Sequence, residues 1–253
     1  MLKKRVIPVL LLRDGRMFKG KQFTDFRDTG DPRSAARIYN AQYADELVFL
    51  DIQASTESRG ALLDIVQVAA SECFMPLTVG GGVSQIEDVR ALLRAGADKV
   101  VITTAAVQNP ALIREAAETF GSQCVVAGID YRGAGDDARA FIKCGSEATG
   151  RHPVDLAREL VALGTGEIML NSIDRDGMMN GYDLETAARV ADAVPVPVIV
   201  CGGAGNFAHL AEAFTTTSVA ATACASIFHF GDNNPIRARS YLRNLGIPLR
   251  VVK

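Results

Sequence analysis

Short apolar segments alternate with longer amphipathic segments along the chain, and no other feature limits the possible folds so strongly. The apolar segments are continuous runs rich in β-branched residues, as expected for parallel strands that are buried on both faces. This pattern predicts eight strands, at residues 6–12, 46–52, 75–79, 99–103, 124–129, 167–171, 196–201 and 219–224.

The segments between these strands have apolar side chains at helical spacing, which predicts helices. The clearest are residues 86–93, 110–119, 153–163, 184–193 and 207–214. Eight strand–helix units in 253 residues give about 32 residues per unit, the length of a βα module. The pattern therefore favours an α/β fold of the (β/α)8 TIM-barrel class, with an open, doubly wound sheet as the alternative.

The sequence also contains an internal repeat. Val48-Phe49-Leu50-Asp51 has a counterpart 120 positions later in Ile168-Met169-Leu170-Asn171, and the glycines that follow residue 79 have counterparts after residue 200. The repeat predicts two half-barrels, at about residues 1–121 and 122–253. We expect residues 1–253 to fold as a single domain, because neither half closes its own sheet.

Composition excludes several classes of function. Lys and Arg number 27 against 29 Asp and Glu, a net charge of −2, whereas nucleic-acid or membrane-surface binding needs a basic excess. No apolar run is long enough to span a membrane, and five cysteines without a CxxC pair indicate neither a disulfide scaffold nor a zinc site. We expect a cytoplasmic protein with no metal, no nucleic-acid partner and no membrane contact.

Two glycine-rich turns are the clearest candidate binding sites. Gly82 and Gly203 each belong to a turn between a predicted strand and a helix, where free N–H groups and the helix dipole attract anions. Thr104 and Ser226 follow the next strand in each half and could add hydroxyl donors. The turns predict two phosphate sites, although such glycines can also serve only to make tight turns. Neither turn matches GxGxxG or a P-loop, so no nucleotide cofactor is expected.

Three carboxylates, those of Asp51, Asp130 and Asp176, lie at or just after predicted strand ends. Asp130 is the leading candidate for general acid–base catalysis, with a helix cap or a surface ion pair as the alternative. The repeat places its counterpart on the first strand, near Leu11, where there is no carboxylate. A mechanism that needs two carboxylates would therefore lack one of them.

The stretch of residues 13–30 is rich in glycine and charge and is predicted to be a mobile loop after the first strand. Lys19 lies in it, so this loop could be a lid that places a lysine over a phosphate. An ordinary solvated loop is the alternative.

Four charged residues of alternating sign begin predicted strands, which predicts a ring across the lower end of the barrel: Arg5, Glu46, Lys99 and Glu167. One interpretation is a structural plug, which would stabilise the fold little because desolvation offsets the attraction between the charges. The functional alternative is a ring that guards an opening.

Over essentially its full length the sequence resembles the cyclase subunit of imidazole glycerol phosphate synthase, the HisF family. The resemblance rests on long motifs: Asp45-Glu46-Leu47-Val48-Phe49-Leu50-Asp51-Ile52, Thr78-Val79-Gly80-Gly81-Gly82, Gly96-Ala97-Asp98-Lys99-Val100, Phe120-Gly121-Ser122-Gln123, Ser172-Ile173-Asp174-Arg175-Asp176-Gly177 and Gly202-Gly203-Ala204-Gly205. It implies a (β/α)8 barrel that pairs with a HisH-type glutaminase. In this family ammonia enters at the lower end and reacts at the upper end with a ribulosyl substrate that has two phosphates, giving imidazole glycerol phosphate and an aminoimidazole carboxamide ribotide.

The resemblance also implies roles for individual residues. The lower ring would be the ammonia gate, Asp98 and Gln123 would face the glutaminase, and Asp130 would be one of two catalytic carboxylates. Asp51 and Asn171 would also line the pocket that holds the substrate. Its phosphates would be held by Lys19, Gly82, Thr104, Asp176, Gly177, Gly203 and Ser226.

The sequence departs from the family pattern at several of these positions. Leu11 stands where the family has its first catalytic Asp, Thr103 replaces an Asn, Asn171 replaces a Thr or Ser, and Cys201 replaces a Ser. Leucine cannot transfer a proton, and loss of a catalytic carboxylate costs on the order of 10²–10⁴-fold in rate. The combination resembles HisF paralogues found with surface-polysaccharide genes, whose ammonia is thought to serve a sugar-modifying amidotransferase in forming an amidino sugar.

Three hypotheses follow. The first is an ammonia-channelling synthase subunit whose acceptor differs from the histidine-pathway substrate. The second is an ordinary cyclase that tolerates Leu11. The third is a catalytically silent barrel that docks and activates a glutaminase; a related phosphosugar isomerase fits less well, because it has no need of a charged lower ring.

Overall fold

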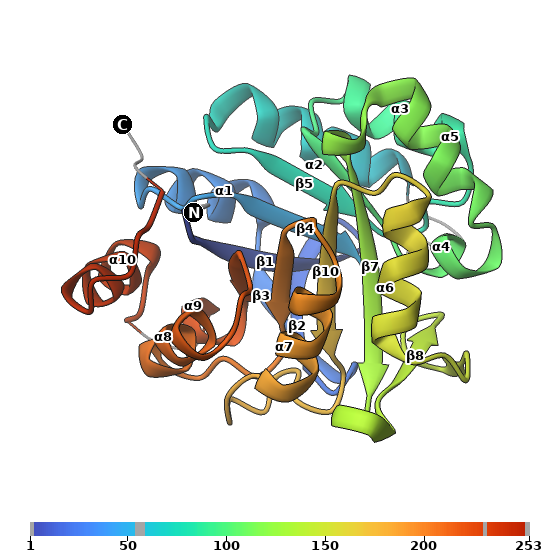
Figure 1. Cartoon of the computed structure of the whole chain (residues 1–253). Helices are drawn as coiled ribbons and strands as arrows, with labels where there is room; N and C mark the ends of the chain where they lie inside the picture. The colour runs from blue at the N-terminus through green and yellow to red at the C-terminus, as the bar shows by residue number, and fades with distance from the viewer. Residues whose placement is uncertain (1–2, 54–58, 230–231, 251–253) are drawn as a thin grey trace.

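The computed structural model describes residues 3–53, 59–229 and 232–250, and within them eight parallel strands form a closed barrel (Figure 1). Neighbouring strands are paired in chain order, and the last one pairs with the first. The TIM-barrel prediction is confirmed, and the open sheet is wrong. The barrel strands are β1 (Arg5–Arg13), β4 (Leu47–Asp51), β5 (Leu77–Gly80), β6 (Lys99–Ile102), β7 (Val125–Arg132), β10 (Glu167–Ser172), β11 (Val198–Cys201) and β12 (Ala221–Cys224).

Helices surround the barrel and cover the outer face of its strands (Figure 1). Several begin at a side chain that accepts the N–H of the third residue along: Asp183, for example, accepts from the amide of Thr186. The five predicted helices agree with the structure to within two residues at either end. The helices are α1 (Pro32–Ala41), α2 (Arg59–Glu72), α3 (Ile86–Arg94), α4 (Thr104–Gln108), α5 (Ala111–Phe120), α6 (Pro153–Ala162), α7 (Leu184–Ala193), α8 (Phe207–Thr216), α9 (Ser226–His229) and α10 (Pro235–Asn244), with 3-10 turns at Ser122–Cys124 and Gly135–Asp137.

Two strands begin later than predicted because of proline. β5 starts at Leu77 rather than at residue 75, and β11 starts at Val198 rather than at residue 196. Pro76 and Pro197 immediately precede these strands and have no N–H to donate to a neighbour. Their carbonyl groups still accept hydrogen bonds from the first residues of adjacent strands.

The loop predicted at residues 13–30 is wrong, because this stretch forms an antiparallel hairpin. β2 (Arg16–Lys21) pairs with the end of β1, and β3 (Thr24–Gly30) pairs with β2. Met17 and Lys19 are buried beneath the hairpin. A second antiparallel extension, β8 (Arg139–Ile142) with β9 (Glu147–Ala148), follows β7.

Side chains that point into the barrel are apolar between its two ends. They come from alternate positions of the strands and form one cluster: Ile7, Val9, Val48, Val101, Val126, Met169, Ile199, Cys201, Ala221 and Ala223. The opposite positions pack against the helices in a second, larger cluster. Apolar side chains therefore fill the interior of the barrel between its lower and upper ends.

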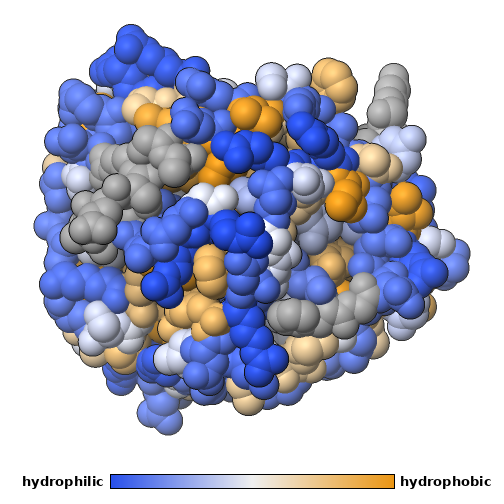
Figure 2. All heavy atoms as spheres, turned by 180° about the vertical axis from the view of Figure 1, so that it is seen from behind, coloured by the Kyte–Doolittle hydropathy of each residue, from blue (hydrophilic) through white to orange (hydrophobic). Residues whose placement is uncertain are grey.

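The surface differs from this interior. On the face seen in Figure 2, hydrophobic residues lie in small groups among hydrophilic ones. No helix in the described part of the chain is long and apolar enough to cross a membrane.

Candidate functional site

The lower end of the barrel, where the strands begin, is crossed by a closed ring of ion pairs. Arg5 contacts both Glu46, at 2.6 Å, and Glu167. Lys99 contacts the same two carboxylates, at 3.0 Å from Glu46 and 2.8 Å from Glu167. Each cation therefore bridges both anions, and the charges of the four side chains sum to zero.

Glu46 is the most deeply placed member of this ring. It is 1% exposed, and the hydroxyl of Thr78 donates to its Oε1 at 2.7 Å. Burial raises the pKa of the carboxyl, but Lys99 and Arg5 together outweigh burial and hold the pKa of Glu46 below its usual value. The ring is charged at neutral pH and meets the apolar interior directly above it.

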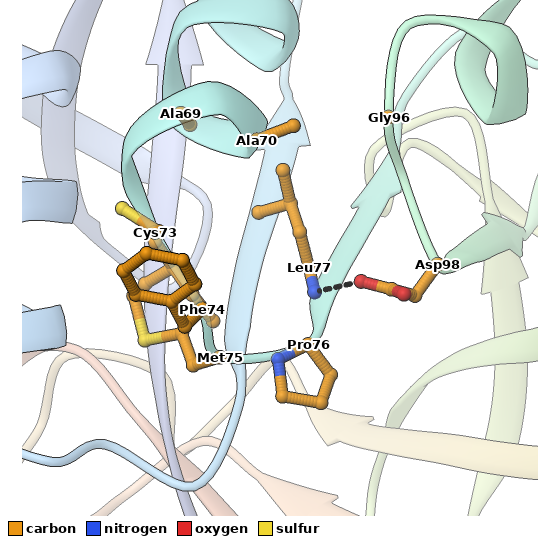
Figure 3. A pocket seen from close by; sticks show the side chains of 10 residues that line it. Ala69, Ala70, Cys73, Phe74, Met75, Pro76, Leu77, Gly96 and Asp98 are labelled. Atoms are coloured by element: carbon orange, nitrogen blue, oxygen red, sulfur yellow. Dashed lines mark hydrogen bonds between the residues drawn. The ribbon is translucent and has the colours of Figure 1, made fainter.

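A pocket of about 240 Å³ opens on the same lower face, between α2 and the starts of β4 and β5 (Figure 3). Asp98 lies at its edge, where its carboxylate accepts the amide of Leu77 at 2.8 Å. Phe74 borders the pocket and is 95% exposed. Gln123, the other predicted interface residue, is exposed within the 3-10 turn that precedes β7.

At the upper end, where the strands finish, the last inward-pointing layer is polar on one half and apolar on the other. Leu11 packs against the inner cluster and stands in the apolar half. The apolar half consists of Leu11, Leu50 and Ala225, the polar half of Thr103, Asp130 and Asn171, and the thiol of Cys201 lies opposite Asn171 between them. The side-chain oxygen and nitrogen atoms of this layer therefore come from β7, β10 and the residue after β6.

Asp130 lies near the end of β7 and is directly opposite Asn171 in the register of β7 with β10. The amide nitrogen of Asn171 donates to Oδ1 of Asp130 at 3.1 Å. Desolvation by burial raises the pKa of Asp130 to about 7; the Asn171 hydrogen bond acts against this, and the charge of Asp176 adds to it. A carboxyl that titrates near neutral pH is suited to both accepting and donating a proton.

Lys19 is brought into the mouth by the hairpin of β2 and β3. It is 3% exposed, and its Nζ lies 2.6 Å from Oδ1 of Asp176. The amide of Gln22 donates to the carbonyl of Asp176 at 2.8 Å, so the hairpin is held on the loop after β10. Sequence reasoning placed Lys19 near a phosphate site, but it did not foresee this pairing.

Most of the predicted phosphate residues meet in one pocket at the mouth. Lys19, Asp176, Gly177, Gly203 and Ser226 all line it, together with Asn171. Gly82 and Thr104 do not line it. The Thr104 hydroxyl instead accepts the amide of Lys143 at 3.0 Å.

Asp51 has a local structural contact. Its Oδ1 accepts the amide of Gln53 at 2.9 Å, which turns the chain after β4. The side chain is buried, and the structure does not place it in the mouth pocket.

The structure adds two residues that sequence reasoning missed. Phe23, at the tip of the hairpin, lines the mouth pocket with a φ of 64°. Cys144 lies in the turn between β8 and β9, with its Sγ 3.7 Å from the carbonyl of Ile52. No sequence signal identified either, because both positions depend on antiparallel extensions that were not predicted.

The groups gathered at the mouth are suited to proton transfer beside an anion. Among the described residues no three His, Cys, Asp or Glu side chains lie close enough together to hold a metal ion. The mouth instead combines one carboxyl of near-neutral pKa with glycine-rich backbone and a buried lysine. These groups fit acid–base chemistry on a phosphorylated small molecule.

Comparison with known proteins agrees with this geometry. The family model described as "Histidine biosynthesis protein" matches residues 5–234. Imidazole glycerol phosphate synthase subunit HisF of Hyphomonas neptunium is 51% identical over 252 residues, and the match covers 100% of both chains.

Proposed function

Because the chain belongs to the histidine biosynthesis protein family, among its HisF members, we propose that it is an ammonia-using synthase subunit supplied by a glutaminase partner. The observation that carries this proposal is the arrangement of three parts along one axis. An ion-paired ring closes the lower end, an apolar interior follows, and a carboxyl of near-neutral pKa stands at the upper end.

Each part suits the passage of ammonia. Neutral ammonia crosses an apolar interior at far lower cost than an ion does, because an ion would lose its hydration there. Bulk ions would meet the charged ring first, and Arg5, Glu46, Lys99 and Glu167 would act as the gate. Ammonia that leaves the interior arrives beside Asp130.

The partner is proposed to be a HisH-type glutaminase on the lower face. Asp98 and Gln123 lie on this side of the barrel, and the pocket beside Phe74 offers an apolar contact close to the ring. A glutaminase docked there would release ammonia at the gate.

We propose that the acceptor is a phosphorylated small molecule other than the histidine-pathway substrate. Leu11 supports this, because the apolar half of the upper layer stands where the second carboxylate of a cyclase would be needed. An acceptor for amidino-sugar formation in surface-polysaccharide synthesis, handled with a sugar-modifying amidotransferase, fits this loss.

An authentic cyclase of histidine biosynthesis is the second candidate. The full-length identity of 51% to a HisF protein favours it, and so does the retained Asp130. Under this candidate the products are imidazole glycerol phosphate and aminoimidazole carboxamide ribotide. Histidine genes beside the coding sequence would favour the cyclase, and sugar-modifying genes would favour the first proposal.

Turnover of the two-phosphate ribulosyl substrate with ammonium salt separates the two candidates. We expect very low activity in the natural chain and a clear rise in Leu11→Asp, which restores a carboxylate opposite Asp130. Robust turnover of the natural chain would establish the cyclase instead. No turnover in either protein, together with stimulation of the glutaminase, would indicate a barrel that only docks and activates its partner.

Coupling to the glutaminase is tested by product formed per glutamine hydrolysed in the reconstituted pair. Lys99→Ala should leave turnover with free ammonia intact and change this ratio, because it opens the ring. Arg158→Ala, which removes an exposed cation from α6, is the control. An unchanged ratio in alanine variants of all four ring residues would reduce the ring to a structural plug.

The phosphate sites are tested by soaking crystals with sulfate. We expect sulfate at the backbone of Gly203 beside Ser226, or at Gly82 beside Thr104, because the positive dipole end of a helix N-terminus attracts anions and glycine lets them approach the backbone. Sulfate that binds well elsewhere and avoids both places would contradict the assignment.

A further inference from the structure

A group of buried polar side chains lies on the outer side of the barrel, directly behind Asp130. Tyr131 is the next residue along β7, so its side chain points the opposite way, into the layer between the strands and the helices. Its hydroxyl donates to Oδ2 of Asp183 at 3.0 Å, and both side chains are buried. Neither residue lines the mouth pocket, so the pair has no direct contact with a molecule bound there.

This pair joins β7, β10 and α7. Asp183 is the residue before the first turn of α7, and its Oδ1 accepts the amide of Thr186 at 3.2 Å. Ser172 of β10 is directly opposite Tyr131 in the strand register. The side chains of Ser172 and Thr186 also interact with the Tyr131 hydroxyl. One phenol oxygen therefore connects two strands with the start of a helix.

The hydroxyl of Tyr131 keeps its proton and remains a donor. Burial is the largest cause that holds the pKa of Tyr131 well above its usual value, and the charge of Asp183 adds to it. A hydrogen bond to an ionised acceptor is stronger than one between neutral groups. Loss of the phenol would also leave a buried carboxylate oxygen without this donor. The contact therefore restrains the ends of β7 and β10 strongly.

The pair lies where the pairing of β7 with β10 stops. Tyr131 and Ser172 are the last residues paired in this register, and β10 ends there. The preceding pair is Asp130 with Asn171, whose 3.1 Å hydrogen bond crosses between the strands on the inner side of the barrel. Strand ends open more readily than strand centres. Opening at this end would separate Asp130 from Asn171 first.

We propose that Tyr131 and Asp183 are positioning residues, which hold Asp130 against Asn171 from the outer side of the barrel. The start of α7 is the fixed support, because Asp183 both caps this helix and accepts the Tyr131 hydroxyl. The Asn171 amide favours the charged form of Asp130, so loosening the two strands should make Asp130 harder to deprotonate. The inference rests on the acid–base role proposed for Asp130, but the measurement that tests it needs no turnover.

Two variants remove the contact from either side. Tyr131→Phe removes the donor and keeps the ring in the outer cluster. Asp183→Ser removes the acceptor and keeps a side-chain oxygen that can cap α7. The matched controls are Tyr241→Phe, at a partly exposed tyrosine of α10, and Asn234→Ser, at the N-cap of the same helix. Far-ultraviolet circular dichroism and melting temperatures show whether each variant is folded.

The measurement is the titration of the Asp130 carboxyl by ¹³C NMR in the full chain. In both variants the midpoint should rise by about half a pH unit or more, the effect of partly losing a hydrogen bond to a charged group. The side-chain amide of Asn171 should shift in the same variants. The double variant should move the midpoint no further than either single variant, because the two side chains form one contact. Both controls should keep the natural midpoint.

A purely structural role would lower the melting temperature and leave the titration of the folded protein unchanged. The inference is overturned if the Asp130 midpoint in a folded variant equals that of the natural chain, or if the two substitutions have additive effects on it. Either variant alone decides the question if the other does not fold.

The pH profile of ammonium-dependent turnover separates this inference from the proposed function. A midpoint that moves without a matching move of the pH profile would leave the positioning intact and reject Asp130 as the acid–base group. A pH profile that follows the Asp130 titration in the natural chain, with a midpoint unmoved in the variants, would do the reverse.

Discussion

At the scale of single residues, position 11 determines whether the upper end of the barrel has one carboxylate or two. Leu11 extends the apolar interior to the upper rim, so Asp130 has a hydrocarbon surface opposite it rather than a second carboxylate. Desolvation by burial raises the pKa of the Asp130 carboxyl to about 7.

Leu11→Asp should therefore reduce stability even where it raises activity. A carboxylate forced into this layer loses hydration and faces Asp130, and we expect a cost of about 1–3 kcal/mol at pH 8. The cost should shrink near pH 5, where the new carboxyl holds its proton. Urea unfolding at the two pH values measures it, and equal stability of both proteins at pH 8 would contradict the description of the layer.

Asp130 makes its own contribution to the pH dependence of folding stability. Its pKa is about 7 in the folded state and about 3.9 when unfolded, so between these values the folded protein binds more protons, and stability falls as pH rises. Asp130→Asn should remove this slope and gain about 4 kcal/mol relative to the natural chain between pH 4 and pH 8. Asp155→Asn, at an exposed carboxylate of α6, is the control for melting temperatures measured over that range. Parallel curves for the natural chain and Asp130→Asn would show that the carboxyl is not desolvated.

At the scale of elements, the hairpin of β2 and β3 depends on close backbone contact with the loop after β10. Gly177 has a φ of +73°, and a Cβ there would collide with the carbonyl of Gly20. Gly177→Ala should displace the hairpin, and amide exchange over residues 16–30 should become about tenfold faster. Gly150→Ala is a matched control, because its φ is +71° and nothing lies within 4 Å. Both variants place alanine at a positive φ, which costs about 1–2 kcal/mol of backbone strain in each. Equal exchange rates in the hairpin would therefore show that the contact between residues 177 and 20 is unimportant.

The same element shows what the sequence could and could not predict. Barrel strands were predictable because they are buried on both faces, and their ends located Asp130 and the glycine turns. The hairpin was missed because Lys19 looks like a solvated residue until its partner, Asp176, is known to lie beside it. The Asp130–Asn171 contact likewise depends on the register of β7 with β10, which no local pattern encodes.

At the scale of the whole molecule, the lower ring joins strands from both halves of the chain. Lys99→Met would leave two buried carboxylates with only Arg5 between them, and we expect a loss of about 3 kcal/mol. Adding Glu167→Gln to Lys99→Met should recover part of that loss, because the charges balance again. Lys143→Met breaks an exposed pair with Glu147 and should cost no more than about 1 kcal/mol in urea unfolding. Strictly additive effects of the two ring substitutions would mean that the four side chains do not act together.

We propose that residues 1–253 unfold as one cooperative unit. β1 pairs with β12 and β6 pairs with β7, so each half-barrel would expose two unpaired edges without the other. Unfolding transitions followed by far-ultraviolet circular dichroism and by tyrosine fluorescence should coincide. Two separate transitions would show that the half-barrels are independent.

The division of the upper layer gives the mouth a preferred orientation for a molecule that binds there. A molecule that settles there finds hydrogen-bonding groups along the edge formed by Thr103, Asp130 and Asn171, and only hydrocarbon along the edge formed by Leu11 and Leu50. A bound molecule with one polar and one apolar edge would therefore be held with its polar edge toward Asp130 and Asn171. Binding at this mouth should therefore distinguish molecules by where along their length their polar groups lie, even with a single carboxylate.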